Sequence, residues 1–143
     1  MLMENFKGAN DLGISEAKRE ALIKTLHLME TGEIVHRRVR SDYYPPYMHS
    51  QSHYFTGHFN MARWNTSMGC QTVACIGGTA EMIGHVRFDF NGECDVSYAL
   101  HDLFNPSLIG SLKHYKDISV EQAAQALRNY LTTGKADWDE ILT

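Results

Sequence analysis

The pattern that most constrains the fold lies near the C-terminus of the chain. Ser119 and Gln122 have the spacing of a capping box, which starts a helix by satisfying its first backbone N–H groups. Gly134 supplies a stop, because glycine adopts the left-handed conformation that ends many helices. Between them the apolar residues recur at helical spacing, on one face: Ala123, Ala126, Leu127, Tyr130 and Leu131. Such a face must be covered by other elements.

A second amphipathic helix is predicted near the N-terminus. Ser15 is placed to cap it, Glu16 suits the positive end of the helix dipole, and Gly32 is the expected stop. Residues 1–13 are expected to form a loosely ordered lead-in. The apolar stripe of this helix consists of Ala21, Leu22, Ile23, Leu26 and Met29. After the last helix, three large apolar side chains are expected to fold back over the core: Trp138, Ile141 and Leu142.

Length and composition indicate a single domain over residues 1–143. A content of 43% hydrophobic and 21% charged residues argues against disorder. With the two amphipathic helices, this predicts a mainly α, compact helical domain that contains one long irregular connection. The net charge of −4 disfavours broad binding to a phosphate backbone. Three cysteines, an odd number, and a first segment that does not read as a leader predict reduced thiols and a cytoplasmic protein. No run of about 18 apolar residues is present, so no membrane span is expected.

The long connection is predicted over residues 33–59. It contains Tyr43-Tyr44-Pro45-Pro46-Tyr47, which cannot lie inside a helix. The simplest interpretation is a tyrosine-rich loop packed on the domain. A protein interface ranks second, because tyrosine and arginine are enriched at binding hot spots. Nucleic-acid binding ranks third, with arginines on phosphates and tyrosines stacked on bases. The candidate interaction residues are Arg37, Arg38, Arg40, Tyr43, Tyr44 and Tyr47.

The small, apolar segment from Cys70 to Gly84 is predicted to be interior scaffolding, as a buried helix that begins near Thr72. Cys70 would then lie at a helix N-terminus, where the dipole favours the thiolate. This gives an alternative function as a cysteine-dependent enzyme, with His85, His58 or His53 as the base and Asp95 to orient it. The simpler interpretation is that Cys70 and Cys75 fill gaps beside the glycines. A Cys-x4-Cys spacing is poor evidence for zinc or for a disulfide.

Residues 86–104 leave two alternatives open. Val86, Phe88 and Phe90 alternate with polar residues before Asn91-Gly92, which predicts a short β-hairpin over residues 86–98. The competing interpretation, slightly favoured, is a helix over residues 95–104, because Asn105-Pro106 would end it.

The histidines suggest a metal site. His49 and His53 are four residues apart and would share one face of a helix, with His58 as a third ligand. The segment lacks the glutamate that a metallopeptidase helix uses as its base. A solvated polar loop is the simpler interpretation, because spacing alone carries no ligand geometry.

Two stretches resemble a known pattern. Residues 59–64, Phe-Asn-Met-Ala-Arg-Trp, and the run from Cys70 to Ala80 resemble F-x-M-x-x-W…C-G-T-x-A-C-I-x-G-W-A, found in small uncharacterised proteins of bacteria and their phages. The C-terminal part, with Leu-Phe-Asn-Pro at 103–106 and Ile-Ser-Val-Glu-Gln-Ala-Ala at 118–124, is similar to the same proteins. The chain departs at Gln71, where the pattern has glycine, and at Thr79, where it has a bulky aromatic residue. The resemblance implies a helical fold and assigns no chemistry.

Together these patterns favour a non-enzymatic protein-interaction module, an accessory protein of phage or mobile-element origin, over the cysteine enzyme and the metal site. The expected partner is another protein, and no cofactor is expected. The surface of the module that binds this partner would be the segment from Arg37 to Tyr47.

Overall fold

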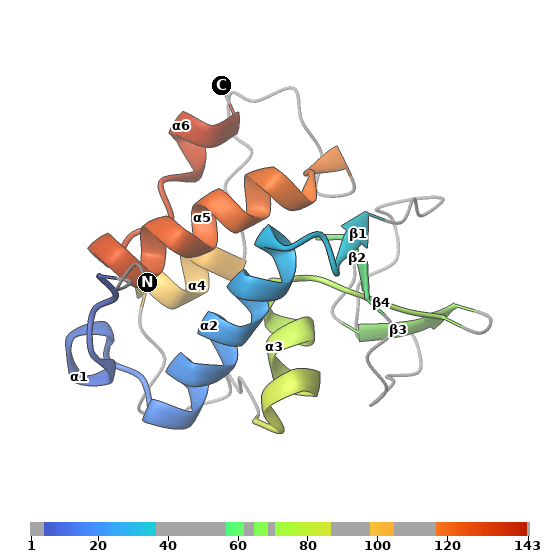
Figure 1. The fold of residues 1–143 in the computed structure, drawn as a ribbon. Helices are drawn as coiled ribbons and strands as arrows, with labels where there is room; N and C mark the ends of the chain where they lie inside the picture. The colour runs from blue at the N-terminus through green and yellow to red at the C-terminus, as the bar shows by residue number, and fades with distance from the viewer. Residues whose placement is uncertain are drawn as a thin grey trace.

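The computed structural model describes residues 5–36, 57–61, 65–68, 71–86, 98–104 and 117–142. These residues form a mainly helical fold, as the sequence predicts, together with a small sheet at positions where the sequence does not predict one (Figure 1). The helices are α1 (Ala9–Leu12), α2 (Glu16–Glu30), α3 (Ile76–Gly84), α4 (Tyr98–Phe104), α5 (Val120–Thr133) and α6 (Trp138–Leu142). The strands are β1 (Val35–His36), β2 (His58–Phe59), β3 (Asn65–Met68) and β4 (Gln71–Ala74).

The two longest helices begin and end where the sequence predicts. The Ser15 hydroxyl caps α2 by accepting from the Lys18 N–H at 3.2 Å, and Gly32 follows the helix with a φ of +81°. In α5 the capping box is complete. The Ser119 hydroxyl accepts from the Gln122 N–H at 3.1 Å, and the Gln122 side chain accepts from the Ser119 N–H at 3.0 Å. These ends are local interactions, which explains why they can be predicted.

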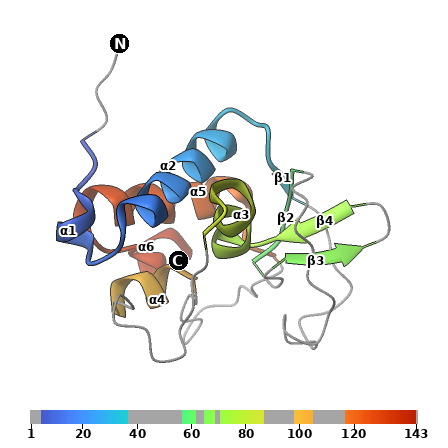
Figure 2. The same cartoon turned by 90° about the horizontal axis from the view of Figure 1, so that it is seen from below.

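The core lies between α2, α3, α4 and α5, which gather on one side of the molecule, while the sheet projects from the other (Figures 1 and 2). Its largest fully buried side chains include Leu22 and Leu26 of α2, Leu103 of α4, and Leu127 and Tyr130 of α5. This arrangement covers the apolar faces that the sequence predicts.

Helices α2 and α3 pack with their backbones close together. A Cβ atom on Gly84 would overlap the Cβ of Ala21 and lie 3.3 Å from its Cα. Only glycine at position 84 therefore permits this approach. The prediction that the segment from Cys70 to Gly84 is interior is confirmed for residues 74–80 and Met82, which are buried, whereas Glu81, Ile83 and Gly84 are half-buried.

The C-terminal residues fold back as predicted. Trp138, at the start of α6, is 5% exposed, and its indole N–H donates to the Leu103 carbonyl at 3.1 Å. This bond joins α6 to α4 across 35 residues of sequence and satisfies the polar atom of a buried indole. Ile141 and Leu142 pack, partly buried, against the same core.

The N-terminal segment is part of the fold from residue 5 onward, although the sequence suggests a loose lead-in. Leu12 of α1 is buried. The Lys7 N–H donates to the Leu131 carbonyl at 2.7 Å, and the Lys7 carbonyl accepts from the Arg19 side chain at 2.7 Å. These hydrogen bonds to α5 and α2 hold the segment in place. The local sequence gives no signal that predicts them. Residues 1–4 lie outside the described residues.

The sheet has the strand order β1-β2-β4-β3. Strands β1, β2 and β4 are parallel, and β3 pairs with β4 in the antiparallel direction. Strand β4 thus has a partner on each side: Val73 lies opposite both His58 of β2 and Thr66 of β3. Within the described residues, no helix combines the length and the apolar character needed to cross a membrane.

The expectation of a helix from Thr72 is wrong. Residues 71–74 form β4, and α3 begins only at Ile76. Thr72 and Val73 are β-branched, which suits a strand, and pairing with β2 and β3 outweighs the helical alternative.

The helical alternative for residues 95–104 is confirmed from Tyr98 onward, where α4 buries Leu100, Leu103 and Phe104. The alternating stretch proposed as a hairpin falls mostly on residues 87–97, which lie outside the described residues. Where the structure does describe two consecutive antiparallel strands, they are β3 and β4.

Candidate functional site

The predicted interaction residues, Arg37 to Tyr47, lie outside the described residues, but both ends of the connection that carries them are described. It leaves β1 after His36 and returns at Gly57, just before β2. The two strands pair in parallel, with Val35 opposite His58 and His36 opposite Phe59, and the Val35 N–H donates to the Gly57 carbonyl at 2.9 Å. The ends of the expected loop are therefore short strands, side by side at one edge of the sheet (Figure 1).

Tight packing holds this base in place. Ile34, just before β1, and Phe59, at the end of β2, are 2% and 0% exposed. Gly57 has a φ of +81°, and a Cβ atom there would lie 2.9 Å from the Glu33 carbonyl oxygen. Next to β2, the N–H of the buried Asn60 donates to the Ala74 carbonyl at 3.0 Å. Loops that connect packed elements of this kind often carry binding residues.

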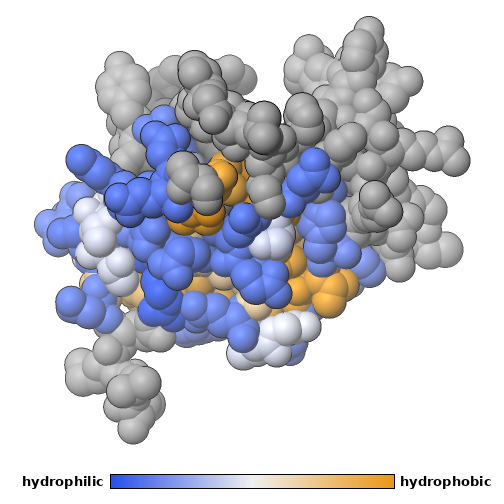
Figure 3. All heavy atoms as spheres, turned by 90° about the horizontal axis from the view of Figure 1, so that it is seen from above, coloured by the Kyte–Doolittle hydropathy of each residue, from blue (hydrophilic) through white to orange (hydrophobic). Residues whose placement is uncertain are grey.

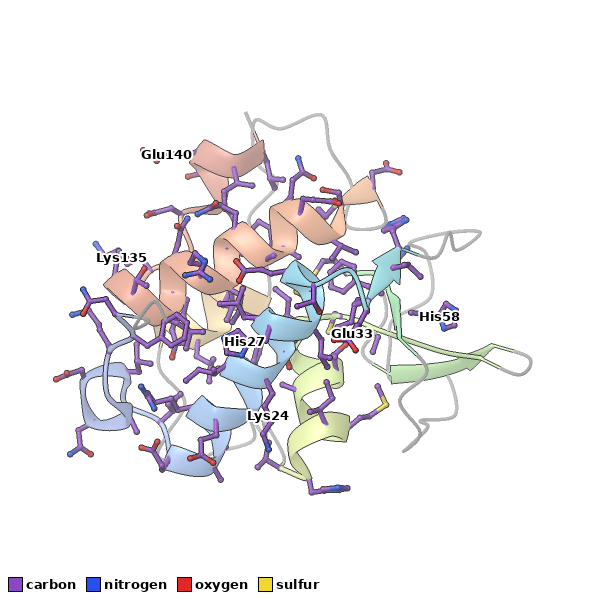
Figure 4. The ribbon with its side chains drawn as sticks, in the orientation of Figure 1. Lys24, His27, Glu33, His58, Lys135 and Glu140 are labelled. Atoms are coloured by element: carbon purple, nitrogen blue, oxygen red, sulfur yellow. The ribbon has the colours of Figure 1, made fainter. Side chains whose placement is uncertain are left out.

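Val35 is unusual at this base. Its side chain is 52% exposed, and it is the one large hydrophobic residue that is exposed among the described positions. It lies on β1, the outermost strand beside β2, two residues before Arg37. His36 is also exposed, and the His58 side chain points outward from β2 (Figure 4). The described part of the connection thus includes an exposed apolar residue that comes just before the arginines in the sequence.

Val35 is not among the interaction residues that the sequence pattern predicts. The available signal is the run Ile34-Val35, two β-branched residues ahead of a proline-containing segment, which is typical of a short strand. Ile34, just before the strand, is buried, whereas Val35 and His36, the two residues of β1, are both exposed. The face of the molecule in Figure 3 is largely hydrophilic, with hydrophobic side chains in a few separate areas.

The cysteine at a helix N-terminus is Cys75, which corrects the expectation for Cys70. Cys75 is the N-cap of α3, and its Sγ accepts from the Gly78 N–H at 3.5 Å. Burial raises the pKa of this thiol from its ordinary value of 9.0 to about 12, against the lowering effect of the Gly78 and Gly77 N–H groups. Desolvation outweighs the helix terminus, so Cys75 stays protonated at neutral pH and is a poor nucleophile.

His85, a histidine proposed as the base, lies far from the N-terminus of α3. His85 is the C-cap of α3 and is exposed, whereas Cys75 is the N-cap. The nine residues of α3 separate the two ends by about 13 Å at the usual helical rise. A direct hydrogen bond between Cys75 and His85 is therefore excluded. Cys70 lies outside the described residues, so its pairing with His85 stays a prediction.

The metal-site alternative depends on three histidines, of which only His58 is described; His49 and His53 are not. His58 lies on β2 and is half-buried. Among the positions that the structure describes, no group of three or more histidine, cysteine, aspartate or glutamate side chains is arranged to hold a metal ion.

An open groove of about 500 Å³ lies between α5 and α6. It is lined by Glu121, Gln122, Gln125, Asn129, Glu140 and Ile141. The Gln125 amide donates to the Asn129 side-chain oxygen at 2.8 Å, and the Asn129 amide donates to the Ala136 carbonyl at 3.0 Å. These bonds fix the amides and join α5 to the turn before α6. The groove is open to solvent, and the side chains of Glu121 and Glu140 on its walls are exposed.

The described residues therefore offer a buried, unreactive thiol, an open groove between α5 and α6, and the packed strands between which the predicted interaction residues lie in the sequence. Comparison with protein-family models, with curated proteins and with solved structures found no match for this chain.

Proposed function

We propose that this protein is a non-enzymatic protein-interaction module. Its binding surface comprises Val35 and the six predicted interaction residues between Arg37 and Tyr47; we call it the β1 surface. The phage or mobile-element origin remains a proposal that rests on the resemblance in sequence alone. The strongest support for the function comes from Val35, whose 52% exposure leaves an apolar residue in water directly before an arginine-rich and tyrosine-rich stretch of the sequence.

The composition of the β1 surface suits a protein partner. Protein interfaces combine apolar side chains with tyrosine and arginine, and a few such residues supply most of the binding energy. Val35 contributes an apolar contact, and the neighbouring arginines and tyrosines have the residue types of hot spots. An extended nucleic-acid backbone suits the chain less well, because its net charge is −4.

The packing of β1 and β2 at the two ends of the connection also favours binding. The backbone hydrogen bond from Val35 to Gly57 and the buried side chains of Ile34 and Phe59 hold both ends of the connection. Holding the ends together lowers the conformational entropy that the intervening residues lose when a partner binds. Ile34 and Phe59 belong to the same hydrophobic core as the buried residues of α2, α3 and α5, so the helices support this surface.

The cysteine-enzyme alternative gains no support from the described geometry, since α3 begins after β4 and its N-cap thiol is buried. Cys70 remains its candidate. Alkylation of a Cys75→Ala, Cys94→Ala variant, which retains only Cys70, would measure that thiol's pKa directly. A value well below the ordinary one would revive the enzyme alternative.

The test is a comparison of matched surface variants. The wild-type protein is immobilised, retained proteins are identified, and each one is purified and titrated against the variants. We expect Val35→Asp, and separately the triple variant Arg38→Ala, Tyr43→Ala, Tyr44→Ala, to weaken binding at least tenfold. The control is Glu20→Ala with Lys24→Ala, two exposed positions on α2, where Lys24 points away from the sheet (Figure 4).

Two results would reject the proposal. One is a partner whose affinity is the same for the wild type, both β1-surface variants and the control. The other is retention of single-stranded nucleic acid, with loss of binding in the arginine and tyrosine variant and a steep salt dependence, which would instead support the third-ranked interpretation. Circular dichroism and thermal unfolding of each variant establish that it is folded.

A further inference from the structure

We draw no further inference here: the strongest candidate, the open groove between α5 and α6 with the exposed carboxylates of Glu121 and Glu140 on its walls, carries nothing because no second feature among the described residues shows what would occupy it.

Discussion

Arg128 of α5 and Glu30 of α2 form a two-pronged ion pair across 98 residues of sequence. The Arg128 Nε donates to Glu30 Oε2 at 2.8 Å, and Nη2 donates to Oε1 at 2.6 Å. The guanidinium also lies over the Phe6 ring, 5.8 Å from its centroid. One arginine therefore joins three segments of the fold: the N-terminal residues, the end of α2 and the middle of α5.

We expect Arg128→Lys to lower the free energy of unfolding by about 1 kcal/mol, because an ammonium group cannot reproduce the bidentate geometry. Both side chains are about one-third exposed, which limits the effect. The control is Glu16→Gln, which removes the single-pronged pair with Arg19 within α2 and should cost less than about 0.5 kcal/mol. Urea unfolding measures both; equal losses would show that the two-pronged geometry is unimportant.

Replacing Gly84 by alanine should destabilise the protein by about 1–3 kcal/mol, the usual cost of overpacking, because the new Cβ overlaps that of Ala21. The test is a double-mutant cycle with Ala21→Gly, which removes the atom that clashes. In that background Gly84→Ala should be close to neutral, since alanine is also the better helix former. Additive losses in the double variant would contradict the proposed contact. Gly8→Ala is a control outside the contact, with 3.9 Å to its nearest neighbour.

Two buried threonines should respond in opposite directions to the same substitution. Thr79 of α3 is 1% exposed, and its hydroxyl has no hydrogen-bond partner among the described residues. Thr25 of α2 is 0% exposed and donates to the Ala21 carbonyl at 2.8 Å. Thr79→Val should raise the melting temperature, because it removes an unpaired buried hydroxyl, whereas Thr25→Val should lower stability by about 1 kcal/mol. Equal melting temperatures for the two variants would refute this distinction.

Burial should protect Cys75 from alkylation. In a Cys70→Ser, Cys94→Ser variant, which retains only Cys75, iodoacetamide should label the folded protein far more slowly than the unfolded protein at pH 8. The cause is the combination of burial and a pKa of about 12. Rapid labelling without unfolding would mean that the thiol is accessible.

The same raised pKa predicts how stability changes with pH. The unfolded thiol loses its proton above its ordinary pKa of 9.0, while the folded thiol retains it up to about 12. The folded state therefore binds more protons in this range, and the contribution of Cys75 to stability falls as the pH rises from 9.0. A Cys75→Ala variant should show a shallower loss of stability above pH 9.0, measured by denaturant unfolding at several alkaline pH values.

Much of the helical framework could be predicted from sequence because its signals are local. The Ser15 cap, the Ser119 and Gln122 capping box and the stop at Gly134 each involve residues within one or two helical turns. The candidate interaction residues could be named for a similar reason, since the arginine and tyrosine run is visible in the sequence itself. The base that holds this run could not be named, because it depends on the pairing of β1 with β2 across more than twenty residues.

The sequence by itself determined where the two long helices begin, where they end and which faces they bury, since neighbouring residues satisfy their caps and set their periodicity. Only the tertiary structure decided that residues 71–74 form a strand, because Val73 must pair with His58 on one side and Thr66 on the other. That pairing moves the start of α3 to Ile76 and places the buried thiol of Cys75 at its N-cap. Backbone pairing of β4 with β3, the strand just before it, and with the more distant β2 outweighed the helix that the small apolar residues of this segment suggest.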